Sequence, residues 1–258
     1  MGTASPGLRR RLMAGLVAAS VVALAGVAPA EQAWVRRAKV LFDNDEYGKV
    51  IELAEPHRKQ TVGAMFLAFS HLQEYVFNGT KYDKEMFKSF KLQLEKRLTS
   101  KDIDDLIYFV DRNDKPEVVK EARRLSKVTF KNIKQVDEVP KLVKVLSSTD
   151  EGTRELALSS IKEIIERRRK YVDKGGTLRA TDIQVMGSSK LIVPLLDRIE
   201  EKNAARTLVM VEEPVLEYLP RYDGQAYVKL DVDINKKITK RKQKYPESNW
   251  YSAVGKTR

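Results

Sequence analysis

An apolar pattern that recurs at a fixed interval is the feature that most constrains the fold of this chain. A shift of the sequence by 36 positions places Leu106 on Leu142 and Leu125 on Ile161. The same shift aligns three further pairs: Phe109 with Val145, Val110 with Leu146, and Asp114 with Asp150. One helix pair cannot bury its apolar stripe alone, whereas neighbouring pairs cover one another. The repeat therefore predicts an all-α chain of stacked helix pairs.

A second repeat, nearer the N-terminus, also has a helical period. Trp34, Ala38 and Leu41 share one helix face, because their spacing is i, i+4, i+7. Tyr47 and Tyr82 occupy the same place in two successive helix pairs, 35 residues apart. Polar residues, glycine or proline separate the predicted helices at residues 43–45, 56 and 78–80.

The N-terminal repeat resembles a known family of helix pairs. Residues 33–98 are similar to tetratricopeptide repeats, whose second helix often begins like the Gly-Thr-Lys-Tyr-Asp-Lys run at residues 79–84. Val50 and Met86 depart from that family, which usually has a small alanine at these places. The resemblance covers about a quarter of the chain.

The central repeat, at residues 102–205, resembles HEAT repeats. The residues that carry the resemblance are Val139, Pro140, Leu142, Leu146, Asp150, Arg154, Ala157 and Ile161. The resemblance implies that the proline bends the first helix and that Asp150 and Arg154 link neighbouring repeats. A degraded unit begins at Val193-Pro194, 54 residues after Val139-Pro140, so we expect an insertion at residues 173–189.

Together these patterns predict a right-handed α-solenoid of about ten helices. Its expected parts are a signal peptide at 1–30, tetratricopeptide-like pairs at 31–98, HEAT-like repeats at 99–212, and a capping segment with an irregular basic tail at 213–258. Within the last part, apolar residues alternate with charged ones from Val228 to Ile234, which is a strand period. No partner strand is evident, so an extended segment and an irregular capping helix are equally expected.

The first thirty residues have the layout of a signal peptide. Three arginines at 9–11 precede an apolar stretch at 12–27, which ends in small residues at 28–30. We expect cleavage after Ala30 and a periplasmic location, with a retained N-terminal anchor as the alternative. The chain contains no cysteine, so the sequence excludes disulfides, thiolate metal sites and a cysteine nucleophile.

The chain is strongly basic. Its net charge of +12 falls to about +9 once the three arginines of the signal segment are removed. For an exported protein this favours an acidic protein, a cell-wall polymer or anionic lipid as partner over nucleic acid. Six cations crowd the C-terminal part and suggest contact with an anionic membrane surface: Lys236, Lys237, Lys240, Arg241, Lys242 and Lys244. A solvated tail is the alternative interpretation.

Catalytic and cofactor signals are weak. The sequence has no G-x-S-x-G elbow, phosphate loop or nucleotide fingerprint, so we predict no catalytic residue, cofactor or metal. Of the two histidines, His57 is expected in a loop and His71 at the edge of the core. Asp102, Asp104 and Asp105 are typical of a helix N-terminus. As a carboxylate cluster they are also the basis for a second alternative, an enzyme acting on cell-wall glycans.

A dense aromatic cluster is the most suggestive binding feature. Its seven residues are Phe66, Phe69, Tyr75, Phe77, Tyr82, Phe87 and Phe90. Their helical spacing favours a core role for most of them, but surplus aromatic side chains also suit an apolar groove between helices. The leading hypothesis is a non-enzymatic scaffold that binds a protein or peptide on the concave face of the stack. The alternative is a carrier of a lipid or sterol-like molecule.

Overall fold

The computed structural model describes residues 32–113, 115–222 and 224–244, and every regular element in these ranges is helical. The all-α class is therefore confirmed, and these residues hold more α-helices than the ten or so expected. The predicted signal peptide and the end of the predicted tail, residues 245–258, lie outside the described residues.

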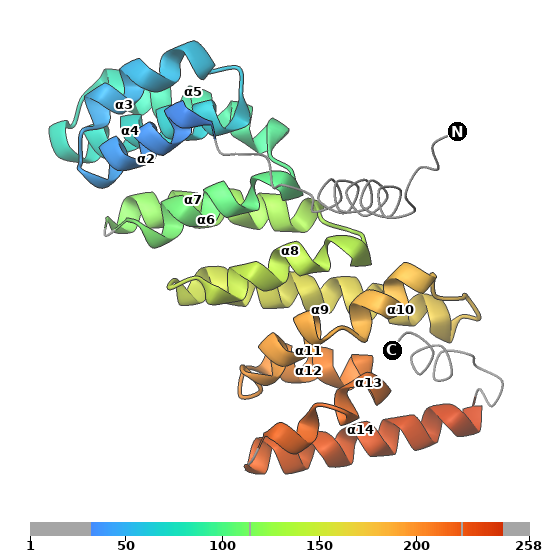
Figure 1. Cartoon of the computed structure of the whole chain (residues 1–258). Helices are drawn as coiled ribbons and strands as arrows, with labels where there is room; N and C mark the ends of the chain where they lie inside the picture. Colours follow the sequence, from blue (N-terminus) through green and yellow to red (C-terminus); the bar gives the residue numbers. More distant parts are fainter. Residues whose placement is uncertain (1–31, 114, 223, 245–258) are drawn as a thin grey trace, which may run out of the picture.

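The helices follow one another with short connections (Figure 1). In chain order they are α2 (Ala33–Asp43), α3 (Tyr47–Ala54), α4 (Thr61–Asn78), α5 (Lys81–Arg97), α6 (Ile103–Asp111), α7 (Pro116–Asn132), α8 (Val139–Lys144), α9 (Glu151–Asp173), α10 (Ala180–Met186), α11 (Ser189–Leu196), α12 (Lys202–Val211), α13 (Glu213–Leu216) and α14 (Gln225–Lys244). Short 3₁₀ turns occur between several of them.

Local chemistry sets the helix ends that the sequence predicts. Gly79 ends α4 in the left-handed conformation, with φ of 68°, which a residue without Cβ adopts readily. The Thr80 side chain then accepts a hydrogen bond from the Asp83 backbone N–H and begins α5. Asp150 caps α9 in the same way, by accepting from the Thr153 backbone N–H at 2.7 Å. The predicted break at residues 78–80 is confirmed.

Successive helices pack in pairs, and the pairs lie in layers from α2–α5 at one end to α14 at the other (Figure 1). The pairs α4–α5, α6–α7, α8–α9 and α11–α12 are in contact. One helix of each later pair also contacts the next, so that α7, α9, α12 and α14 form a continuous series. We call this series the second-helix layer.

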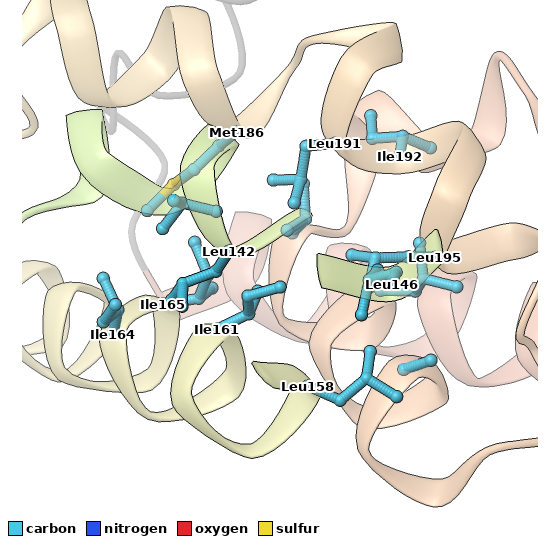
Figure 2. Packing of buried hydrophobic residues seen from close by; sticks show 14 of the residues in the cluster. Leu142, Leu146, Leu158, Ile161, Ile164, Ile165, Met186, Leu191, Ile192 and Leu195 are labelled. Atoms are coloured by element: carbon cyan, nitrogen blue, oxygen red, sulfur yellow. The ribbon is translucent and has the colours of Figure 1, made fainter. Parts of the chain in front are cut away.

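Two clusters of buried apolar residues support the layers. One joins α2 to α7, and the other extends from the end of α7 to α14. The four apolar pairs aligned by the 36-residue shift are buried in both repeats, as Leu106 and Leu142 show with 0% exposure each. Figure 2 shows how the second cluster is filled, with Ile161 of α9, Met186 of α10 and Leu191 of α11 around Leu142 of α8.

The buried face of α2 is shifted from the predicted one by one position along the sequence. Val35, Ala38 and Phe42 are buried, whereas Trp34 and Leu41 are only half-buried. Both sets have a helical period, so the sequence pattern alone does not distinguish them. The ring of Trp34 is instead stacked on His57, with ring centroids 4.1 Å apart.

The predicted insertion at 173–189 contains a helix of its own. After α9 ends at Asp173, the chain turns through Gly175, whose φ is 88°. Helix α10 then buries Ile183 and Met186, and Met186 belongs to the second core cluster. The helix packs against the 3₁₀ turn before α8. This insertion therefore contributes to the core.

The C-terminal segment is a helix packed on α12 and α13, so the extended segment is wrong, and the capping helix of the alternative prediction is regular rather than irregular. In α14, Leu230, Ile234 and Ile238 are buried at i, i+4 and i+8, while Val228 and Val232 point away and are exposed. Residues 230 and 234 fit a period of two as well as a helical turn, which explains the apparent strand pattern. The basic run at 236–244 therefore lies on a packed helix and not in an irregular tail.

Candidate functional site

Most of the seven aromatic residues predicted to line a groove are part of the core. Four are buried: Phe66, Phe69, Phe87 and Phe90. The other three reach the surface, Tyr75 in part and Phe77 and Tyr82 largely. The seven side chains therefore do not form one binding surface.

A ring from another helix explains why these side chains are internal. Phe109 of α6 lies against Phe66 and Phe69, with ring centroids 5.1 and 4.4 Å apart. Phe42 of α2 contacts Phe66 and Phe109 edge-on. Aromatic rings prefer such offset and edge-to-face contacts. Together they fill the centre of the N-terminal cluster. This agrees with the core role that their helical spacing favoured, rather than with an apolar groove for a ligand.

His71 is buried rather than at the edge of the core. It is 2% exposed, and its Nδ1 lies 2.8 Å from a carboxylate oxygen of Asp83. Its ring stacks on Phe90 and meets Tyr82 edge-on. A polar group inside a protein needs such a partner, so the pair joins α4 to α5 and satisfies the imidazole.

The three acidic residues at the start of α6 each have a partner within the fold. Asp102 accepts hydrogen bonds from the backbone N–H and the hydroxyl of Thr99. Asp104 lies 3.4 Å from Lys144, and Asp105 forms an ion pair with the lysine at position 39. The described residues contain no group of three or more side chains suited to hold a metal ion.

A basic groove lies between α9, α12 and α14 in the second-helix layer. It encloses about 1080 Å³ and is open to solvent. The lining residues are Lys162, Glu166, Ile199, Glu200, Lys202, Ala205, Arg206, Val209, Met210, Gln225, Ala226, Lys229, Leu230, Asp233 and Lys237. The sequence analysis identified none of them as a site except Lys237, because they come from helices far apart in the chain.

The walls of the basic groove combine apolar and cationic side chains. Val209, Met210 and Leu230 supply apolar surface. Five lining cations form no ion pair with any described residue: Lys162, Lys202, Arg206, Lys229 and Lys237. Unpaired like charges in a concave surface create a positive potential that attracts anionic groups.

One carboxylate in the groove responds to this potential. Glu166 accepts a hydrogen bond from Lys170, at 2.9 Å, and this contact lowers the pKa of Glu166. The charges of Lys162 and Arg206 lower that pKa further. Glu166 therefore stays ionised at neutral pH, and the groove still has an excess of cations over anions.

The basic run of α14 is divided between the surface and the interior. Lys236, Lys237 and Lys240 are exposed. Arg241, which the sequence analysis assigned to an anionic surface, points inward: its Nε donates to Glu212 at 2.6 Å and its Nη1 to Asp173 at 2.7 Å. Arg241 is therefore a structural residue, whereas Lys236, Lys237 and Lys240 are exposed for surface contacts.

Two buried carboxylates hold other segments of the chain to α9. Glu212 is fully buried between Arg241 and Arg169, whose Nη2 lies 2.8 Å from it. Asp182 is fully buried as well and pairs with two further arginines, at 2.6 Å from Arg168 and 2.7 Å from the arginine that precedes α10. Arg168 and Arg169, near the end of α9, therefore bind carboxylates of other segments. Their neighbours stay within α9, since Arg167 donates to the Glu163 carbonyl and Lys170 pairs with Glu166.

None of the helices in the described part of the chain has the length and apolar character needed to cross a membrane. Comparison of the chain with protein-family models, with curated proteins and with solved structures finds no match.

Proposed function

We propose that this chain is a non-enzymatic, periplasmic scaffold of the α-solenoid type that binds an acidic protein or peptide in the basic groove. The 36-residue repeat and the successive helix pairs support the solenoid architecture. The resemblance to tetratricopeptide and HEAT repeats supports a binding role, because both families mostly bind proteins or peptides. This last step is an analogy of fold.

The unpaired cations of the basic groove are the observation that supports the proposal most. Lys202 and Arg206 of α12 and Lys229 of α14 are exposed and have no ion-pair partner among the described residues. They flank the apolar side chains of Met210 and Leu230. A partner with acidic residues beside an apolar anchor would complement both features, gaining association rate from the charges and affinity from apolar burial.

Charge reversal tests the proposal directly. The chain from Glu31 to Arg258 is expressed in a bacterial periplasm and captured under gentle conditions, and the bound proteins are identified by mass spectrometry. With the variant Lys202→Glu/Arg206→Glu/Lys229→Glu, we expect the recovered amount of the acidic partner to fall at least about tenfold relative to the wild type. The affinity for that partner should also decrease as salt rises.

A matched variant on another helix is the control. Lys120, Lys127 and Lys131 on α7 are also exposed and without an ion-pair partner in the described residues. Their triple replacement by Glu changes the net charge equally and should leave the captured partner in place. Equal loss in both variants would show general charge attraction and would contradict a role of the groove.

The alternative function, a carrier of a lipid or sterol-like molecule, requires a different kind of cavity. It needs an enclosed apolar cavity, whereas the basic groove is open and has charged walls. Extraction of the same captured protein with organic solvent separates the two functions. A stoichiometric lipid or sterol-like molecule, with no protein partner, would favour the carrier over the scaffold.

A further inference from the structure

A second, smaller concavity lies beside the C-terminal part of α9 and is separate from the basic groove. It encloses about 200 Å³ between α9, the segment before α8 and the segment before α10. We call it the arginine pocket. Its lining residues are Lys134, Gln135, Val136, Ile164, Arg167, Arg168, Tyr171 and Arg179.

Cations outnumber anions around the arginine pocket. Arg168 and Arg179 share the buried carboxylate of Asp182. Arg179 also lies 4.0 Å from the exposed carboxylate of Asp137. Lys134 and Arg167 form no ion pair with any described residue, and donate only to backbone carbonyls of their own neighbourhood. Four cations therefore face a small volume with one buried carboxylate between them.

Arg168, which lines the pocket, has a hydrogen-bond donor without a partner among the described residues. The Nε of Arg168 is buried and makes no hydrogen bond with the described residues. A buried donor left in this state costs free energy, so it indicates a missing acceptor. An oxygen of a bound anion is the acceptor that suits a guanidinium best.

One wall of the pocket is held in a fixed position. The Tyr171 ring lies under the Arg168 guanidinium, 4.7 Å from its centre. Gly176 approaches the same ring so closely that an added Cβ would lie 2.3 Å from a ring carbon. Stacking and the absence of a side chain at position 176 therefore orient Arg168 before any ligand arrives.

We propose that the arginine pocket binds a phosphate group, carried by a small molecule or by a lipid headgroup. Arginine forks match the oxygen geometry of phosphate and bind it in a bidentate manner, and lysine adds a point charge. Two prepositioned arginines, one further arginine and one lysine provide this donor set at Arg168, Arg179, Arg167 and Lys134. The site is independent of the proposed partner in the basic groove.

Titration of the chain from Glu31 to Arg258 with inorganic phosphate tests the proposal. Isothermal calorimetry at constant ionic strength should show saturable binding to the wild type, with sodium chloride as the reference. The double variant Lys134→Ala/Arg167→Ala removes the two cations without carboxylate partners and should weaken binding at least about tenfold. Its thermal unfolding should match that of the wild type, because neither side chain takes part in an ion pair with the described residues.

The control is Lys120→Ala/Lys127→Ala, which removes the same charge from α7 and should bind phosphate like the wild type. Vesicles of phosphatidylcholine with and without phosphatidic acid form the second arm. Binding to phosphatidic acid alone, lost only in the pocket variant, would assign the phosphate to a lipid headgroup. Wild-type protein that binds neither probe, or equal losses in both variants, would overturn the proposal.

Discussion

Glu212 is the residue at which burial, charge and backbone strain coincide. Its φ of 59° and ψ of −113° lie in a region that side chains rarely adopt, and its carboxylate is fully buried. The contacts with Arg169 and Arg241 explain how this conformation persists. The burial of the neighbouring Glu213, together with the negative charge of Glu212, raises the pKa of Glu213. The junction between α12 and α13 therefore combines a strained backbone with a buried negative charge, and the two arginines offset the cost of both.

Replacement of Glu212 by Ala should destabilise the protein strongly. The change leaves Arg169 buried without its carboxylate, and breaking such a pair typically costs about 3–5 kcal/mol. Urea unfolding followed by circular dichroism measures the loss. Glu212→Gly should cost about 1 kcal/mol less, because glycine removes the backbone strain. Glu155 is an exposed acid of α9, and a loss no larger than that of Glu155→Ala would contradict the role assigned to Glu212.

The partners of single residues were the part of the structure least accessible from the sequence. Arg169, near the end of α9, binds a carboxylate 43 positions away, which no local pattern indicates. Asp150 was expected to link repeats through the HEAT-like pattern. It does pair with Arg123 of α7, at 2.5 Å, but Arg154 donates to the carbonyls of Ser148 and Thr149 in its own loop.

At the scale of the element, prediction depended on how local the determining interactions are. The end of α4 and the start of α5 follow from a glycine and a threonine within two positions, and both were predictable. The character of α14 was not, because Leu230 and Ile234 suit a strand or a helix equally well. Only packing against α12 and α13 selects the helix.

Two glycines on neighbouring elements should respond in opposite ways to the same substitution. Neither Gly79 nor Gly48 has an atom within 4 Å of an added Cβ, so only the backbone decides. Gly79→Ala should cost about 1 kcal/mol, because alanine disfavours the positive φ. Gly48→Ala, inside α3, should stabilise by about 0.5–1 kcal/mol. Thermal unfolding measures both, and a stabilised Gly79→Ala would contradict the left-handed cap.

At the scale of the molecule, the repeat register was predictable and the binding surfaces were not. The 36-residue shift identifies the apolar core positions correctly, because the residues of each apolar stripe lie close together in the sequence, within one helix. The lining of the basic groove, by contrast, comes from separate segments of the chain, from Lys162 of α9 to Lys237 of α14. Its existence depends on how the helices stack, which no single stretch of sequence encodes.

The division of the core into two clusters predicts local responses to mutation. Phe109→Ala should destabilise the first cluster by about 3–5 kcal/mol, since it removes the ring packed on Phe66 and Phe69. Hydrogen exchange should accelerate in α2–α7, with α12 and α14 little affected, because each layer contacts mainly its neighbours. Ile192→Ala should give the reverse pattern. Uniform acceleration throughout would show one cooperative unit instead.

The adjacent positions of Arg168 and Arg169 make the length of α9 itself a constraint. One of these arginines binds the carboxylate that begins α10, and the other binds the carboxylate that anchors α14. Each residue of an α-helix is rotated by about 100° from the one before. Deletion of a single residue upstream in α9 would thus turn both guanidinium groups away from their partners at once. Substitutions at exposed positions of α9 leave both ion pairs in place, whereas changes in its length do not.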